Sequence, residues 1–348
     1  MSTSSARLFI RSLNNQSLFL CSEAVIYECQ RTMNGFLRTR LLVATQCCRQ
    51  QAIRWSSHST PDVGPSQRSK VTLHAIRNMY RKKIPISALT VHDFPSAMVA
   101  DRAGVDLVLV GDSLAMVALG YESTNYLSMD EMLYHCRAVA RGSKAPFIVA
   151  DLPFGTYEVS PQQALASSIQ LVRDGHAEAV KLEGGSEMAE TVRAITVTGI
   201  PVLGHIGLTP QRSTSLGGFR VQGKTAAEAE SLAQSARDLQ DAGCFGVVLE
   251  AMPAEVADYV TNSITIPTIG IGAGSGCDGQ ILVQLDMLGN FDRFTPKFVK
   301  KYANNFSTNV DAIENYVNDV KSKDFPSLEH TYPMSDTELE KLKKLKRS

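Results

Sequence analysis

Ionisable side chains stand at the ends of six short apolar segments of this chain. Capping explains a single Asp in such a place, because Asp and Ser favour the starts of helices. It does not explain a histidine or two glutamates, so the set as a whole points to a functional site. Its members are Asp93, Asp112 with Ser113, Asp151, Glu183, His205 and Glu250.

The stretch AVKLEGG (179–185) places a lysine and a carboxylate at the end of an apolar segment. Alternate residues of a strand point to the same face, so Lys181 and Glu183 share one face and Leu182 takes the other. This pattern predicts that the shared face opens on a polar cavity. A structural salt bridge between Lys181 and Glu183 or Asp151 is the alternative.

Asp112, Asp151 and Glu183 form an oxygen-rich candidate metal site with no cysteine. Carboxylates of this kind suit Mg²⁺, which keeps several waters and binds through one or two carboxylates plus substrate oxygens. A 2-oxo acid would chelate such an ion and form an enolate when a neighbouring carbon loses its proton. Lys181, a compact cation, would then neutralise the substrate carboxylate.

Glu250 is the candidate base for that proton. It stands between VVL and AMP, and an apolar setting raises the pKa of a carboxyl group toward neutrality. The alternative is a carboxylate at the start of a helix. His205 lies beside the flexible turn of GHIGLTPQ (204–211), and a satisfied core histidine is the alternative for this residue.

Short β-branched runs alternate with amphipathic helical patterns from residue 84 onward. The alternation indicates parallel strands with crossover helices. Eight strands over roughly 210 residues predict a (β/α)8 TIM barrel, whose active site lies at the carboxyl ends of the strands. An open doubly wound sheet is the alternative. We expect strands at 86–91, 105–110, 147–150, 179–182, 201–204, 246–249, 267–271 and 281–284.

Further helices are predicted on both sides of these strands. Apolar residues within 71–82 recur at helical spacing, so we expect a helix that plugs the lower end of the barrel. Residues 295–304 and 309–322 read as helices, and the Lys-rich end as a solvated tail. Gly274, Gly276 and Gly279 have dinucleotide-loop spacing, but no long helix pattern follows, so a dinucleotide site is rejected.

Charge is distributed unevenly along the 348 residues, although the formal net charge is zero. Residues 1–70 contain eight Arg and one Lys against three acidic residues, which is typical of a mitochondrial transit segment. The alternative is a disordered N-terminal extension that carries no targeting signal. The remainder has a net charge of −6, which argues against a nucleic-acid partner. No apolar run reaches the roughly 18 residues of a membrane span.

Several long motifs resemble the ketopantoate hydroxymethyltransferase family. The resemblance runs in order from about residue 70 to FPSLEH at 325–330. The motifs are LTVHDFPSA (89–97), VGDSLAMVALGYEST (110–124), DEMLYHCRAVARG (130–142), VADLPFGTY (149–157), VKLEGG (180–185), GHIGLTPQ (204–211), LEAMP (249–253) and IGIGAGSGCDGQILV (269–283).

The resemblance implies a TIM barrel of the phosphoenolpyruvate/pyruvate-binding type. It implies transfer of a hydroxymethyl group from 5,10-methylenetetrahydrofolate to 3-methyl-2-oxobutanoate, giving 2-dehydropantoate for pantothenate and coenzyme A synthesis. It also implies a homo-oligomer, often a decamer in bacteria, although the sequence shows no interface signature. By its motifs, the resemblance implies that Asp112 and Asp151 bind Mg²⁺ and that Glu183 supports the ion. It implies that the keto acid contacts Asp112, Ser113, Asp151 and Lys181. It further implies that Glu250 removes the proton and that His205 lies near the substrate.

These observations divide the chain into three predicted parts: a transit segment at 1–69, a catalytic barrel at 70–332 and a charged tail at 333–348. Other functions stay open on the residues alone. A Mg²⁺-dependent lyase or aldolase on a related barrel would use the same metal and enolate without folate. Lys181 would instead be the nucleophile if the ketone formed a Schiff base. A barrel kept as a ligand-binding scaffold is the non-enzymatic alternative.

Overall fold

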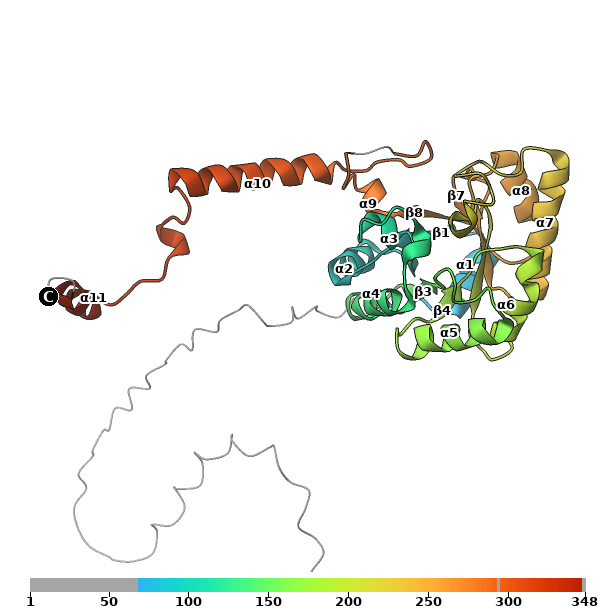
Figure 1. Cartoon of the computed structure of the whole chain (residues 1–348), viewed down its shortest axis with the longest axis horizontal. Coiled ribbons are helices and arrows are strands. Elements are labelled where there is room, and N and C mark those ends of the chain that lie inside the picture. Colours follow the sequence, from blue (N-terminus) through green and yellow to red (C-terminus); the bar gives the residue numbers. More distant parts are fainter. Residues whose placement is uncertain (1–67, 293–294, 346–348) are drawn as a thin grey trace, which may run out of the picture. The chain divides into compact units, whose positions relative to one another are not determined.

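Eight parallel strands close into a barrel in the computed structural model, which describes residues 68–292 and 295–345 (Figure 1). Neighbouring strands pair in sequence order, and β8 pairs with β1 from Ile86↔Gly279 to Thr90↔Val283. This closure confirms the predicted (β/α)8 barrel over an open sheet. The strands are β1 (Ile86–Thr90), β2 (Leu107–Val110), β3 (Phe147–Asp151), β4 (Ala179–Lys181), β5 (Val202–Gly207), β6 (Gly246–Glu250), β7 (Thr268–Ile271) and β8 (Gly279–Val283).

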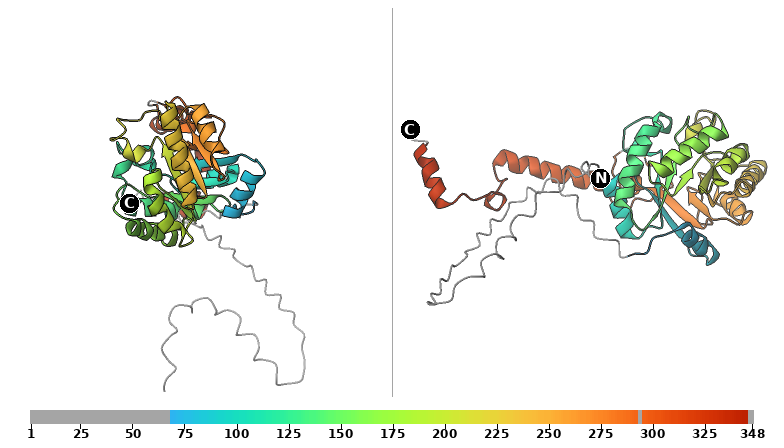
Figure 2. Two further views of the ribbon diagram at one scale, coloured as in Figure 1. Left: turned by 90° about the vertical axis from the view of Figure 1, so that its right-hand side faces the viewer. Right: turned by 90° about the horizontal axis from the view of Figure 1, so that it is seen from below.

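Helices surround the strands, and polar side chains fix several helix starts (Figure 2). Asp93 accepts a hydrogen bond from the Ser96 N–H at 2.8 Å and caps α2, so capping accounts for this strand-end carboxylate. The barrel helices are α2 (Phe94–Ala103), α3 (Leu114–Val117), α4 (Met129–Gly142), α5 (Pro161–Arg173), α6 (Ala189–Thr196), α7 (Ala226–Asp241), α8 (Ala254–Asn262) and α9 (Gln284–Met287).

Two apolar clusters follow from strand alternation. Residues such as Val108 and Val110 face outward and pack beneath the helices, whereas Leu107 and Leu109 face the barrel interior. Helix α1 (Leu73–Arg81) confirms the predicted helix before β1, and Ile76 from its apolar face belongs to the interior cluster. The lower end of the barrel is therefore closed by side chains, which leaves the carboxyl end for a site.

The segment 295–304 corrects one prediction, because it contains no helix in the structure. Phe298 and Val299 instead line a cavity at the carboxyl mouth of the barrel. The backbone N–H of Tyr302 donates to the carbonyl of Met287 at 2.7 Å, in place of a bond within a helix. Tertiary contacts thus override the local helical pattern.

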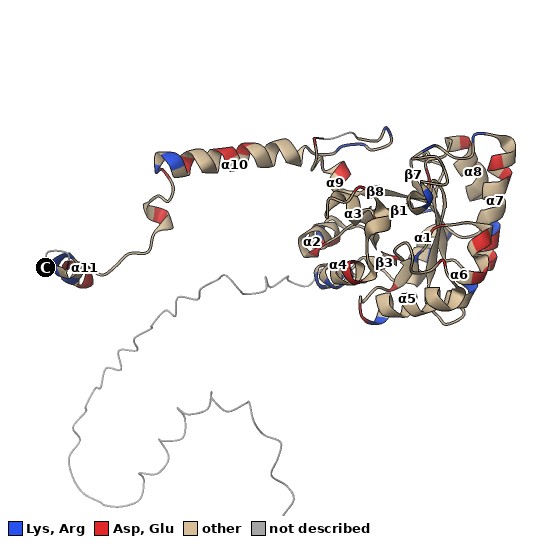
Figure 3. Cartoon of the chain, in the orientation of Figure 1, with Lys and Arg blue, Asp and Glu red and all other residues tan. Residues whose placement is uncertain are grey.

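Two later helices, α10 (Asn305–Ser322) and α11 (Asp336–Leu345), contain no buried residue. Helix α10 confirms the helix predicted at 309–322 and begins four residues earlier. The tail predicted at the end of the chain is exposed, and its residues from Asp336 to Leu345 form α11. Lys341–Glu338 and Lys343–Glu340 pairs are among the charges on this helix (Figure 3). Residues 1–67 of the predicted transit segment lie outside the described residues.

Membrane crossing needs a long apolar helix. Within 68–292 and 295–345, none of the helices has both the length and the hydropathy for that.

Candidate active site

Most of the predicted site residues face the barrel interior because they continue the inward phase of their strands, whereas Asp112 lies in the turn after β2, out of that phase. Val149 belongs to the interior cluster, so Asp151, two residues later in β3, points the same way. Strands β3, β5 and β6 run further than predicted, and three site residues therefore lie inside strands. The same two-residue step leads from Ala179 to Lys181 and Glu183, from Leu203 to His205, and from Val248 to Glu250.

One cavity of about 130 Å³ brings all the predicted site residues together at the carboxyl mouth. A cavity of this size holds a small acid with a few waters. The predicted residues that line it are Asp112, Ser113, Asp151, Lys181, Glu183, His205 and Glu250.

A buried ion pair lies at the floor of this cavity. Lys181 Nζ donates to Asp151 Oδ1 at 2.5 Å, and the two residues are paired in register across β3 and β4. The backbone N–H of Asp112 donates to Asp151 Oδ2 at 2.9 Å. The structure thus contains the salt bridge between Lys181 and Asp151 that was the alternative role for this lysine. The second carboxylate beside the pair is that of Asp112.

Burial and neighbouring charges shift the pKa values of this pair. Burial raises the pKa of Asp151 to about 7, with Lys181 acting in the opposite direction and Asp112 adding to the rise. Burial lowers the pKa of Lys181, but the carboxylates of Asp151, Glu183 and Asp112 outweigh it and the net pKa is raised. Lys181 is therefore an ammonium ion and not the free amine that a Schiff base requires.

Glu183 is the most deeply buried carboxylate of the site, with 1% of the residue exposed. Its Oε2 accepts a hydrogen bond from the Gln211 N–H at 3.0 Å, while Oε1 has no hydrogen-bond partner among the described residues. Burial raises its pKa well above the usual value, and Asp112 adds to that effect. An orphaned buried oxygen of this kind calls for a proton, a water or a cation.

His205 lies between this carboxylate and that of Glu250. His205 Nε2 is 3.1 Å from Glu250 Oε2, and Nδ1 is 3.6 Å from Glu183 Oε1. Neither ring nitrogen is aligned for a hydrogen bond with the described residues, so His205 is not a satisfied core histidine. Burial, followed by the charge of Lys181, lowers its pKa and favours the neutral imidazole.

The donor set fits a hard divalent cation. Within the described ranges no three His, Cys, Asp or Glu side chains form a ready-made metal cage. Mg²⁺ rarely needs one, because it binds through one or two carboxylates and fills its octahedron with water and substrate oxygens. Asp112 and Asp151 are adjacent, and the orphaned Oε1 of Glu183 supplies an acceptor for a metal-bound water.

Backbone geometry beneath Glu250 depends on a glycine. Gly207 at the end of β5 has a φ of 97°, and a Cβ atom there would lie 2.3 Å from the Glu250 carbonyl oxygen. Ala251, the next residue of the neighbouring chain segment, also has a positive φ, of 48°. The close approach of β5 and β6 that sets the position of Glu250 therefore requires a residue without a side chain.

Some residues at the site were not found by sequence reasoning. Phe298 lines the cavity but lies in the segment expected to be helical, and Gln211, in the motif GHIGLTPQ, contacts two site carboxylates from outside the cavity lining. Gln211 follows β5, yet its amide reaches Asp112 from β2 at 2.8 Å. Only its place in the motif marked it, because a contact between these distant residues cannot be read from spacing.

Comparison with known proteins agrees with this geometry. The sequence profile of a family described as ketopantoate hydroxymethyltransferase matches residues 70–328. The chain belongs to this family. The match covers every strand of the barrel and all of the site residues above.

Relatives of this family lie across fungi and bacteria. A 3-methyl-2-oxobutanoate hydroxymethyltransferase of Emericella nidulans is 54% identical over 307 residues, covering 87% of each chain. Those of Oleidesulfovibrio alaskensis and Moorella thermoacetica are 56% and 51% identical, covering 73% and 77% of this chain and 88% and 99% of their own. Among solved structures, phosphonopyruvate hydrolase shares the fold at 14% identity with a TM-score of 0.50, over 79% of this chain and 95% of that one.

Gly207→Ala tests the backbone constraint at Glu250, with Gly199→Ala as its matched control. Both glycines have a φ above 90°, but a Cβ at Gly199 meets nothing within 4 Å. We expect Gly199→Ala to lower the free energy of unfolding by about 1–3 kcal/mol, from backbone strain alone. Gly207→Ala should cost about 1–3 kcal/mol more, from the clash. Equal losses in urea unfolding would show that the close approach does not matter.

Proposed function

We propose that this chain transfers a hydroxymethyl group from 5,10-methylenetetrahydrofolate to 3-methyl-2-oxobutanoate, giving 2-dehydropantoate for pantothenate and coenzyme A synthesis. Family membership and the names of relatives about 50% identical support the reaction. The observation that carries it is the single cavity where three acids, one ammonium ion and a separate fourth acid converge. This is the arrangement that proton removal beside a ketone needs.

Asp112 and Asp151 would hold Mg²⁺, and Glu183 would support the ion through water. When bound, the metal supplies Lewis-acid stabilisation of the charge that develops on the keto oxygen. Lys181 remains an ammonium ion beside Asp151 and offsets the charge of the substrate carboxylate. Ser113, which lines the same cavity, would bind and orient the acid.

Glu250 would accept the proton from C3 of the keto acid. Its side chain faces the cavity and is 15% exposed, against 3% for His205, so it has room to meet a substrate carbon. Neutral His205, 3.1 Å away, would orient the carboxylate without supplying a competing charge. C3 then forms a bond to the folate methylene carbon, both bonds of that carbon to N5 and N10 break, and water supplies the hydroxyl group. The proton from C3 and one proton of the water pass to the two nitrogens.

An isotope-exchange assay tests this function. 3-Methyl-2-oxobutanoate labelled with deuterium at C3 should lose its label to solvent only when protein and Mg²⁺ are present. Adding 5,10-methylenetetrahydrofolate should convert the acid to 2-dehydropantoate. Exchange that resists EDTA would refute the metal-dependent route. The lyase or aldolase alternative would be favoured if the protein cleaved another 2-oxo acid without folate and did not convert 3-methyl-2-oxobutanoate with 5,10-methylenetetrahydrofolate.

Glu250→Gln should slow C3 exchange by about 10²–10⁴-fold, because an amide cannot accept the proton. Binding of the metal and the keto acid should persist, since other residues provide it. The control is Glu255→Gln, which changes an exposed glutamate on α8 and should leave exchange unaltered. If Glu250→Gln and Glu255→Gln exchange at the same rate, the base is another group.

We propose that the chain forms a homo-oligomer, as a decamer or a smaller assembly, through α10. Five apolar side chains of this helix recur at spacings of four and three residues and are exposed: Phe306, Val310, Ile313, Val317 and Val320. Such a stripe is stabilised when another apolar surface covers it.

Ile313→Asp tests this association, because Ile313 lies at the middle of the stripe and is 63% exposed. We expect the charge to reduce the mass measured by sedimentation velocity. Asn315→Asp adds the same charge on another face of α10 and should leave the mass unchanged. A wild-type monomer, or two variants with the same mass as the wild type, would contradict the proposal.

Mitochondrial location is proposed from the Arg-rich residues 1–69. A fluorescent protein fused to residues 1–69 should enter mitochondria, and a chain that consists of residues 70–348 should not. Cytosolic fluorescence from the first fusion would contradict the proposal. Small-molecule acids and folate are the other proposed partners, with no role for nucleic acid or membrane.

A further inference from the structure

Gln211 connects carboxylates that come from different strands of the barrel. It lies in a short 3₁₀ turn, Pro210–Arg212, after β5, and is 3% exposed. Its side-chain Nε2 donates to Asp112 Oδ2 at 2.8 Å, and its backbone N–H donates to Glu183 Oε2 at 3.0 Å. One residue therefore holds one oxygen of each of two carboxylates.

The amide of Gln211 has a single orientation that satisfies all its neighbours. Nε2 donates both to Asp112 and to the carbonyl oxygen of Leu152, at 3.0 Å. Oε1 accepts a hydrogen bond from the Tyr157 hydroxyl at 2.6 Å. Turning the amide over would set Oε1 against a carboxylate and a carbonyl, both of which are acceptors, at the cost of two buried hydrogen bonds.

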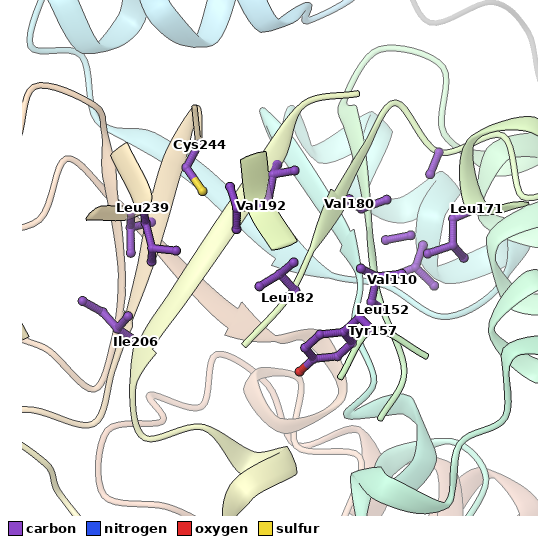
Figure 4. Packing of buried hydrophobic residues seen from close by; sticks show 14 of the residues in the cluster. Val110, Leu152, Tyr157, Leu171, Val180, Leu182, Val192, Ile206, Leu239 and Cys244 are labelled. Carbon is purple, nitrogen blue, oxygen red and sulfur yellow. The ribbon is translucent and has the colours of Figure 1, made fainter. Parts of the chain in front are cut away.

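Tyr157 supplies the partner for the other side of this amide, whose orientation the Asp112 and Leu152 acceptors set. Its ring is fully buried next to Leu152 and Leu182, and its hydroxyl oxygen points away from these side chains (Figure 4). The hydroxyl proton goes to Gln211 Oε1, and the hydroxyl oxygen accepts a longer hydrogen bond from the Glu183 N–H, at 3.4 Å. Without that proton the Gln211 oxygen would lose its partner.

We propose that Gln211 is a positioning residue that presets Asp112 and Glu183 for a divalent cation, and that Tyr157 acts through its short hydrogen bond to the Gln211 amide rather than through its longer contact with the Glu183 N–H, at 3.4 Å. This inference rests on the proposed metal site. The neutral side-chain amide and the backbone N–H of Gln211 suit the task, because they hold Asp112 and Glu183 respectively without supplying a charge that competes with the ion. Glu183 Oε1 is left without a partner among the described residues, available to a metal-bound water.

The test measures metal affinity in the folded, full-length protein, with Mn²⁺ as the probe and electron paramagnetic resonance to count the free ion. Gln211→Met keeps the length of the side chain and removes its three hydrogen bonds. We expect it to raise the Kd for Mn²⁺ by about 10–100-fold, as is usual for a group that orients metal ligands. Tyr157→Phe should raise the Kd by a smaller factor and provides a milder change should Gln211→Met fold poorly.

Gln284→Met is the matched control. Gln284 is also 3% exposed, and its Nε2 also donates to a backbone carbonyl, that of Ser96 at 3.1 Å, but among the described residues it has no hydrogen bond to a carboxylate. We expect the control to lose stability in urea unfolding, as Gln211→Met does, yet to keep the wild-type Kd for Mn²⁺. Equal Kd values for Gln211→Met and Gln284→Met would overturn the proposal.

The double variant Gln211→Met/Tyr157→Phe tests the route from Tyr157 to the metal. If Tyr157 acts through Gln211, the double variant should bind Mn²⁺ no more weakly than Gln211→Met alone. Losses that multiply would assign Tyr157 an independent role and overturn this part of the proposal. A wild-type protein that does not bind Mn²⁺ would overturn both the metal site and the inference. If the wild type binds Mn²⁺ tightly and the variants have the same Kd, the inference alone is overturned.

Discussion

An imbalance of buried charge governs the mouth of this barrel. Asp112, Asp151 and Glu183 are buried there beside one ammonium ion, that of Lys181, which is bound to Asp151 at 2.5 Å. Burying carboxylates without enough positive charge raises their pKa values, as the shifts of Asp151 and Glu183 show. The proposed divalent cation would supply the missing positive charge, and the chemistry proposed here depends on it.

The rest of the fold serves to hold these groups together against their repulsion. Strand alternation turns Asp151, Lys181 and Glu183 inward, and Asp112 joins them from the turn after β2. The interior apolar cluster beneath them, closed by α1, denies them water from below. Because Gly207 has no side chain, β5 can pack closely against the backbone of Glu250 at the end of β6. Gln211 donates hydrogen bonds to Asp112 and Glu183, which come from different strand ends. A lysine or arginine in its place would compete with the metal for these carboxylates.

Much of this arrangement could be predicted from the sequence, because local rules decide it. The two-residue period of strands places Lys181 and Glu183 on one face without any tertiary information. Eight apolar runs, six of which end in an ionisable group, indicate a barrel with its site at the carboxyl ends. The structure confirms the barrel and brings those residues to one cavity. Asp93 shows the limit of the rule, since its carboxylate caps α2.

Long-range contacts decide what the sequence could not show. Residues 295–304 have a helical pattern, but Phe298 and Val299 line the cavity and the backbone bonds to the end of α9. Gln211 and Tyr157 are 54 residues apart and meet at 2.6 Å only because the barrel brings the loops after β3 and β5 together. The exposed stripe of α10 becomes visible only once burial along the helix is known.

The convergence of acids on one cation is the central claim, and an anomalous difference map tests it most directly. Crystals of the full chain grown with Mn²⁺ and 3-methyl-2-oxobutanoate should show one strong peak at the carboxyl mouth. That peak should lie about 2.1 Å from oxygens of both Asp112 and Asp151, with the acid completing the coordination. A keto acid bound at the mouth with the Mn²⁺ peak elsewhere, or with Lys181 covalently attached to it, would contradict the account.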